Sequence, residues 1–172
     1  LAHEASLRGI GLARAHGDRR AEARLRGQAG WLAFDLGRVN DGERLLRDAV
    51  HALRAKGAHA DLAACLTRLA SVDRHLGRLD ASAEHLAEAR RVLPAGHPGH
   101  HAVTLHEGCL HLERREVAQA RAELERARDG LHTLGHCWRE GYATLALGGA
   151  AWLEGQLDEA ADCYEAAAHA FE

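Results

Sequence analysis

A stretch of eleven residues recurs in related form four times along the chain, and this repetition restricts the fold more than any other feature. The four copies are LGRVNDGERLL at 36–46, LGRLDASAEHL at 76–86, RREVAQARAEL at 114–124 and EGQLDEAADCY at 154–164. When Gly37, Gly77, Arg115 and Gly155 are taken as equivalent, the copies are spaced 40, 38 and 40 residues apart. Self-similarity at a fixed period of this size is typical of a repeat architecture.

Five positions of the repeat carry the same kind of residue in every copy. A small residue stands seven positions before the turn residue and five after it, an apolar residue stands two and nine after it, and alanine stands twelve after it. In chain order these are Gly30, Ala70, Gly108 and Gly148; Gly42, Ser82, Ala120 and Ala160; Val39, Leu79, Val117 and Leu157; Leu46, Leu86, Leu124 and Tyr164; and Ala49, Ala89, Ala127 and Ala167. We expect the small residues to let two helices of one repeat approach closely. We expect the large residue at position nine to fill the space between one repeat and the next.

The composition favours helix throughout the chain. Hydrophobic residues make up 47% of the sequence but aromatic residues only 4%, so the apolar mass is mostly Ala and Leu. These residues favour helices, and no segment shows the alternation of a half-buried strand. We therefore expect an all-α fold of antiparallel helix pairs, with turns near residues 37, 77, 115 and 155 and no sheet.

The repeats define the expected organisation of the chain. GLARAHG at 11–17 is similar to ALRAKG at 52–57, so the first segment corresponds to a half-repeat. We expect one repeat domain over 1–172, with repeats at approximately 1–17 (half), 20–57, 58–96, 99–135 and 137–172. Because the sequence starts at Leu1 without Met and ends at Glu172 in a helical pattern, we also expect it to be a fragment of a longer chain whose ends are weakly packed.

The segment GQLDEAADCYEAA at 155–167 carries the clearest resemblance to a known family, the tetratricopeptide repeat (TPR) family. The resemblance extends over roughly the whole chain, although TPR motifs have about 34 residues and these repeats have nearer 40. The longer repeat resembles the helical arrays of large bacterial multidomain regulators. The resemblance implies a right-handed α-solenoid of about four repeats plus an N-terminal half-repeat. It also implies a concave groove lined by first helices, and a role in protein or peptide recognition.

Charge and cysteine content limit the cellular context. The formal net charge is −3 with all fourteen histidines neutral, and such a small bulk charge selects no class of partner. The four cysteines lack CxxC spacing, which favours reduced thiols inside a cell over a disulfide framework. There is no apolar run long enough to span a bilayer and no signal-peptide pattern. We therefore expect a cytoplasmic protein that has no membrane partner.

Three motifs suggest chemistry but have simpler explanations. GHPGHH at 96–101 supplies three imidazoles without a nearby Cys or carboxylate, which favours a solvated loop over a zinc site. His106, Cys109 and Glu113 share one helical stripe, but a metal site there requires a fourth ligand from elsewhere, so we interpret them as groove-lining residues. LALGGAAWLEG at 145–155 lacks the GxGxxG pattern and a preceding strand, which argues against a nucleotide site. We expect no metal, no cofactor and no enzymatic activity.

The inward positions of the first helices supply the candidate binding residues. The aromatic and charged side chains expected there dominate binding hot spots in protein interfaces. The predicted binding residues are Arg24, Trp31, Phe34, Arg68, Arg74, His106, Glu113, Tyr142 and Trp152, and Gln28, Asp35, Ser71, His75 and Cys109 share their register. In the alternative interpretation, Trp31 and Trp152 pack between helices instead of contacting a partner.

Two functions remain open at this point. The first is a non-catalytic scaffold that binds a protein or peptide in the groove. The second is a small-molecule sensing domain of a multidomain regulator, which requires an enclosed apolar pocket. Six arginines stand among residues 1–30, whereas 140–172 carry seven acids and no Lys or Arg, so head-to-tail self-association is an additional prediction. The arginines alternate with Ala, Leu and Glu at helical spacing, so we expect no nucleic-acid contact.

Overall fold

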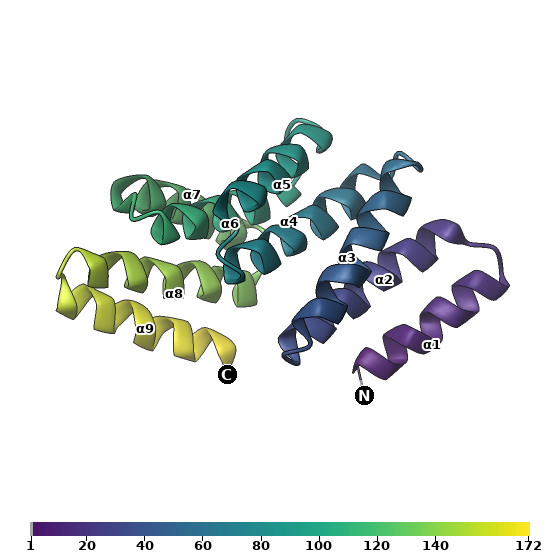
Figure 1. The fold of residues 1–172 in the computed structure, drawn as a ribbon. Helices are drawn as coiled ribbons and strands as arrows, with labels where there is room; N and C mark the ends of the chain where they lie inside the picture. Colours follow the sequence, from purple (N-terminus) through teal and green to yellow (C-terminus); the bar gives the residue numbers. More distant parts are fainter. Residues whose placement is uncertain (1) are drawn as a thin grey trace. The chain divides into compact units, whose positions relative to one another are not determined.

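The structure is a computed structural model that describes residues 2–172, with side chains from residue 4 onward. Within this range the chain forms helices joined by short turns, and no strand is present (Figure 1). The helices are α1 (Ala2–Ala15), α2 (Arg19–Asp35), α3 (Val39–Arg54), α4 (His59–His75), α5 (Leu79–Val92), α6 (Gly99–Glu113), α7 (Val117–Thr133), α8 (Cys137–Leu153) and α9 (Leu157–Phe171). The expected all-α fold is confirmed.

The chain divides into two compact units, Leu1–Ala95 and Gly96–Glu172. In the first unit α2 pairs with α3 and α4 pairs with α5, while α1 packs on α2. In the second unit α6 pairs with α7 and α8 pairs with α9 (Figure 1). The inclusion of all 172 residues in one repeat domain stays a prediction.

First and second helices lie on opposite faces of each unit. The first helices of neighbouring pairs contact each other, α2 with α4 and α6 with α8. Over residues 2–172, no such contact joins the second helices α3 and α5, or α7 and α9. The first helices of each unit therefore form a common face, as the TPR resemblance implies.

The turn inside each helix pair is built by one residue with a left-handed backbone. Gly37 has φ 76°, its N–H donates to the Phe34 carbonyl at 2.8 Å, and the Arg38 N–H donates to the Ala33 carbonyl at 2.9 Å. These two bonds define a Schellman motif, which satisfies the last carbonyl groups of α2. Gly77, Arg115 and Gly155 have φ values of 72°, 62° and 78° at the equivalent positions. All four predicted turns are present.

The predicted small residues lie where the two helices of a pair approach most closely. A Cβ atom on Gly42 would lie 2.8 Å from the carbonyl oxygen of Gly30, so neither position has room for a side chain. In the second unit, a Cβ on Gly108 would lie 2.7 Å from Leu124. The sequence predicts that Leu124 packs between repeats. In the structure Leu124 covers Gly108 of its own helix pair, because glycine has no side chain and leaves space there. Leu124 also reaches the next repeat, since it shares a core cluster with Leu147 of α8.

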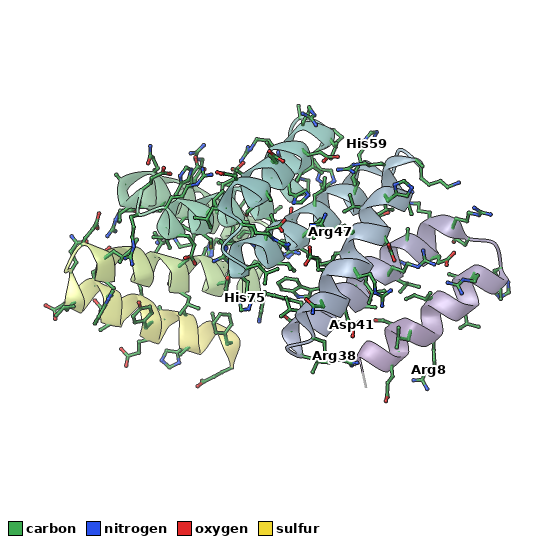
Figure 2. The ribbon with its side chains drawn as sticks, viewed as in Figure 1. Arg8, Arg38, Asp41, Arg47, His59 and His75 are labelled. Carbon is green, nitrogen blue, oxygen red and sulfur yellow. The ribbon has the colours of Figure 1, made fainter. Side chains whose placement is uncertain are left out.

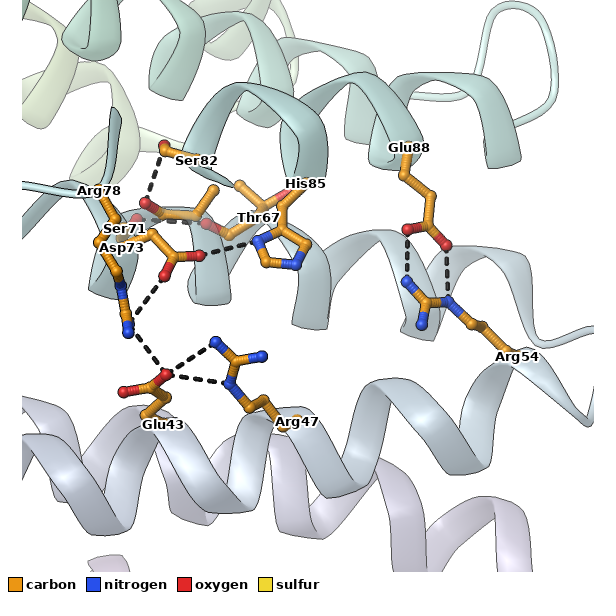
Figure 3. Close-up of polar contacts among 11 residues, drawn as sticks. Glu43, Arg47, Arg54, Thr67, Ser71, Asp73, Arg78, Ser82, His85 and Glu88 are labelled. Carbon is orange, nitrogen blue, oxygen red and sulfur yellow. Dashed lines mark hydrogen bonds and ion pairs between the residues drawn. The ribbon is translucent and has the colours of Figure 1, made fainter. Parts of the chain in front are cut away.

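A buried carboxylate joins two repeats of the first unit. Asp73 is completely buried at the end of α4, and its carboxylate accepts a hydrogen bond of 2.8 Å from Nδ1 of His85 in α5 (Figure 3). Nη2 of Arg78 lies 2.8 Å from the other Asp73 oxygen and 2.9 Å from Glu43 of α3. A buried charge is tolerated only when such partners compensate it. Asp73 therefore orients the turn that follows α4 and, through Arg78, attaches it to α3.

In the second unit, Arg121 of α7 occupies the position that Glu43 holds in α3, six residues after the turn. Its guanidinium group reaches into the next repeat, where it donates to Glu154 at 2.7 Å and to Glu159 at 2.6 Å. These hydrogen bonds hold the pKa of the Glu159 carboxyl below its usual range. A charged side chain at this position therefore joins consecutive repeats in both units.

The role of Asp73 can be tested by substitution. We expect Asp73→Ala to lower the free energy of unfolding by about 2 kcal/mol, because Arg78 and His85 lose their buried partner. Asp48→Ala, at an exposed position of α3, is the control and should change it by less than about 0.5 kcal/mol. Urea unfolding followed by circular dichroism measures both, and equal stability of the two variants would contradict this role.

The left-handed backbone of Arg115 provides a second test. Residues other than glycine lose about 1 kcal/mol in this conformation, so Arg115→Gly should raise the free energy of unfolding by about that amount. The neighbouring Arg114 has helical backbone angles, and Arg114→Gly should lower stability by roughly 0.5 kcal/mol. Thermal unfolding of both variants measures these changes. Stability changes of the same sign in the two variants would be inconsistent with the turn geometry.

Candidate partner-binding faces

An aromatic cluster lies on the first-helix face of the first unit. The rings of Trp31 and Phe34, both in α2, have centroids 5.4 Å apart. The Phe34 ring also meets the His75 ring of α4 edge-to-face at 5.3 Å. Figure 2 shows His75 at the end of α4, on the same side of this unit as Arg38 at the start of α3. The helices come this close because Gly27 has no side chain where Cys65 of α4 packs against α2.

Charged groups of opposite sign surround this cluster. Partial burial raises the pKa of the Asp35 carboxyl, while the nearby Arg68 guanidinium of α4 acts in the opposite direction. Arg68 and Arg74 are half-buried on α4, and Arg24 is exposed on α2. The first unit carries sixteen Lys and Arg residues against twelve acids. We call Trp31, Phe34, Arg68, Arg74 and His75 the α2–α4 face.

The first-helix face of the second unit is also aromatic. The rings of His106 in α6 and Tyr142 in α8 have centroids 6.4 Å apart. Tyr142 stacks nearly parallel on Trp138 at 6.2 Å, and Trp138 contacts Phe171 of α9 at 5.9 Å. This unit carries six arginines against thirteen acids, so its charge is opposite to that of the first unit.

Comparison with solved structures defines the fold. The chain resembles BtubC (BKLC) from P. vanneervenii with a TM-score of 0.68 and 16% identity, over 94% of this chain and 76% of that one. It also resembles the TPR-like repeats of a putative kinesin light chain from Podosopora anserina, with a TM-score of 0.58 and 15% identity, over 98% of this chain and 92% of that one. The chain has a TPR-like repeat fold.

Sequence comparison connects this TPR-like chain with a bacterial protein. No family model matches the sequence. The chain is 29% identical to the regulatory protein AfsR of Streptomyces griseus over 198 residues, an alignment that includes 97% of this chain. The chain spans about a fifth of the length of that relative, since 20% of AfsR is covered. Across the part that the structure describes, none of the TPR-like helices is long and apolar enough to cross a membrane.

The structure corrects two of the groove positions expected from the TPR resemblance. Cys109 is 4% exposed and belongs to the core between α6, α7 and α8, because α8 packs beside α6 and covers it. Ser71 is buried in α4, where its hydroxyl donates to the Thr67 carbonyl at 3.2 Å. Neither residue can contact a partner in the groove.

The remaining predicted residues fall in the two separate units. Arg24, Trp31, Phe34, Arg68 and Arg74 belong to the first, and His106, Glu113, Tyr142 and Trp152 to the second. The structure brings Trp31 together with Phe34, and His106 together with Tyr142. Glu113 lies exposed at the end of α6, and Trp152 is 60% exposed, which contradicts its alternative interpretation as a residue packed between helices.

The histidines of segment 96–101 pack at the start of a helix of the TPR-like array. The sequence predicts a solvated loop over 96–101, but His100 and His101 belong to the first turn of α6, and the His101 ring covers Gly130 of α7. Among the side chains that the structure describes, those of residues 4–172, no three His, Cys, Asp or Glu lie close enough together to hold a metal ion.

Sequence reasoning missed Trp138 and Phe171. Trp138 stands in the first turn of α8, outside the register positions assigned to the groove. The signal that could have identified it is helical spacing, because Trp138, Tyr142, Leu145 and Trp152 follow one stripe of α8 at intervals of four, three and seven residues. Phe171 had no such signal, since it contacts Trp138 only through the packing of α9 on α8.

In the first unit, a depression of about 340 Å³ lies along the second helix α3 and not on the first-helix face. Its lining consists of Asn40, Glu43, Arg44, Arg47 and Asp48, which are all polar or charged and come from one helix. A small-molecule site is typically enclosed and mostly apolar. This depression therefore lacks the character expected of an effector site, and none of the predicted binding residues line it.

The cysteines should differ in reactivity according to their place in the TPR-like array. Cys137 is exposed and Cys163 is half-buried, whereas Cys65 and Cys109 are buried. Burial raises the pKa of the Cys65 thiol to about 11, which suppresses the reactive thiolate at neutral pH. We expect iodoacetamide at pH 8 to modify Cys137 first, and Cys65 and Cys109 only after unfolding. Peptide mass spectrometry over time measures this order, and early modification of Cys65 would contradict the packing of α4 on α2.

Proposed function

We propose that this chain is a non-catalytic interaction domain that binds a protein or peptide segment on the α2–α4 face. The observation that carries the proposal is the contact of Trp31, Phe34 and His75 across two adjacent first helices. Aromatic side chains and arginines contribute most of the binding energy in protein interfaces. Both kinds of side chain belong to α2 and α4, the first helices of this unit, which supports the proposal.

The chemistry of the face suggests the character of the partner. The rings offer apolar area, while Arg68 and Arg74 add positive charge beside it on α4. A partner segment with carboxylates next to an apolar side chain would complement both features, because guanidinium groups form strong charge-assisted bonds with carboxylates. The first unit also has a net excess of basic residues, which favours encounter with an acidic segment. His106 and Tyr142 are proposed as additional contacts on the second unit.

The relationship to AfsR suggests the wider context. That relative is a bacterial regulatory protein much longer than this chain, so we infer that the parent protein is a cytoplasmic regulator in which these repeats receive a partner. A small-molecule effector bound at the same face is the alternative function. The similarity to a regulator favours this alternative, which requires an enclosed apolar pocket on the α2–α4 face.

The proposal can be tested with selected peptides. A displayed library of random 15-residue peptides is selected on the chain, and the tightest peptide is titrated calorimetrically. We expect Trp31→Ala and Arg74→Ala each to weaken binding by about 2 kcal/mol or more, because both remove a hot-spot side chain. Arg47→Ala on α3 is the matched control and should change the affinity less than twofold.

The same variants separate the alternatives. Circular dichroism first establishes that each variant keeps its helicity. Equal and negligible losses in Trp31→Ala and Arg74→Ala would exclude the α2–α4 face as the binding surface. If selection yields no peptide but a metabolite raises the melting temperature of the wild-type chain and not of Trp31→Ala, the effector-sensing alternative is correct.

A further inference from the structure

A continuous apolar surface is exposed at the end of the second unit. It combines one stripe of α8 with one stripe of α9, and the two are joined by the ring contact between Trp138 and Phe171. Its members are between 38% and 62% exposed: Trp138, Leu145, Trp152, Leu157, Tyr164 and Phe171. We call this set the terminal face. Large exposed apolar surfaces of this kind usually mark interaction sites.

The repeat register shows what covers this surface elsewhere in the chain. The residues nine and sixteen positions after the turn are Leu124 and Leu131 in α7, and both are at most 1% exposed. They form one core with Ala143 and Leu147 of α8, the first helix of the next repeat. In α3 the equivalent residues are also buried, and α4 packs against that helix. In α9 they are Tyr164 and Phe171, which are 39% and 42% exposed.

The position that carries a charged residue in α3 and α7 is apolar in α9. Six residues after the turn, α3 has Glu43 and α7 has Arg121, and both make ion pairs with the following repeat. The equivalent residue of α9 is Ala161, which is exposed in the same stripe as Leu157 and Tyr164. The contact expected at the terminal face is therefore apolar along its centre.

We propose that the terminal face docks an amphipathic α-helix with a basic flank, in the position that α8 occupies on α7. The central part of this helix should carry a small residue followed four positions later by Leu, the pattern by which Ala143 and Leu147 pack against Leu124 and Leu131. A helix bound in a groove by such spaced anchors is a common mode of recognition. The site is distinct from the α2–α4 face and does not depend on it.

Charge determines the flank of the docking helix. Beside the apolar stripe of α9 runs a second stripe with the same helical spacing, made of Asp158, Asp162, Glu165, His169 and Glu172. Residues 140–172 contain seven acids and no Lys or Arg, so this part of the chain carries a net negative charge. A helix with Lys or Arg along one edge would complement this stripe, whereas a second copy of the terminal face would set acid against acid.

Two synthetic peptides test the proposal on the full 172-residue chain. Both are 20-residue helices with the Ala and Leu stripe of α8; one carries Lys along the flank and the other carries Glu. Fluorescence anisotropy of labelled peptide measures binding. We expect the Lys peptide to bind at least tenfold more tightly than the Glu peptide, and its affinity to fall as the salt concentration rises.

Substitutions locate the bound peptide. Trp152→Glu and Leu157→Glu change residues that are about 60% exposed on α8 and α9, so both variants should keep the fold. Each should weaken the Lys peptide at least tenfold, and the double variant Asp162→Lys with Glu165→Lys should reverse the preference between peptides. Leu36→Glu, at a similarly exposed leucine in the first unit, is the control and should change the affinity less than twofold. Trp31→Ala should leave it unchanged, which separates this site from the α2–α4 face.

Three results would overturn the proposal. The first is no saturable binding of the Lys peptide at millimolar concentration, and the second is binding that Trp152→Glu and Leu157→Glu leave intact. The third is concentration-dependent dimerisation of the chain in sedimentation velocity that Leu157→Glu abolishes, because the occupant would then be a second copy.

Discussion

Within each unit, the packing of a first helix against the second helix of the preceding repeat, α4 on α3 and α8 on α7, is the contact on which the remaining structure depends. In the second unit, Ala143 and Leu147 of α8 fill the space over Leu124 and Leu131 of α7. Within its own pair Leu124 packs over Gly108, which has no side chain, and Ala143 and Leu147 of the next repeat complete the core around it. Stability therefore arises from neighbouring repeats, as expected for repeat proteins. The same contact places the first helices side by side, which creates the face proposed for partner binding.

The predictions from sequence succeeded where one residue decides the local structure. Gly37 and Gly77 determine turns because a left-handed backbone favours glycine, and Gly30 and Gly108 mark close contacts because a Cβ atom does not fit. The prediction failed where the rotation of a helix decides exposure, since the repeat period does not determine how far α8 covers Cys109. The ion pairs of Asp73 were also missed, because a charged residue at that position resembles an exposed one until the tertiary packing is known.

The candidate faces differ in ways that assign them to different partners. The α2–α4 face combines rings with arginines in a basic unit, whereas the terminal face combines large apolar side chains with a row of acids. The first suits an acidic segment and the second a basic helix, because each would pair opposite charges around an apolar centre. Sequence reasoning placed Trp152 with the first kind of surface. Trp152 is exposed and fits the terminal face better. Its equivalent in the repeat, Phe34 of α2, contacts the first helix of the next repeat, which is the position that a helix docked on the terminal face would occupy.

Hydrogen exchange of the dilute monomer measures the dependence of each repeat on its neighbour most directly. Helices α7 and α9 are both second helices of the same unit, but only α7 is covered by a following first helix. Local stability follows the burial of apolar contacts, so amides of α9 should exchange at least about tenfold faster than those of α7. Equal protection of α7 and α9 would contradict the account, because burial by the next repeat would then contribute nothing to the stability of a helix pair.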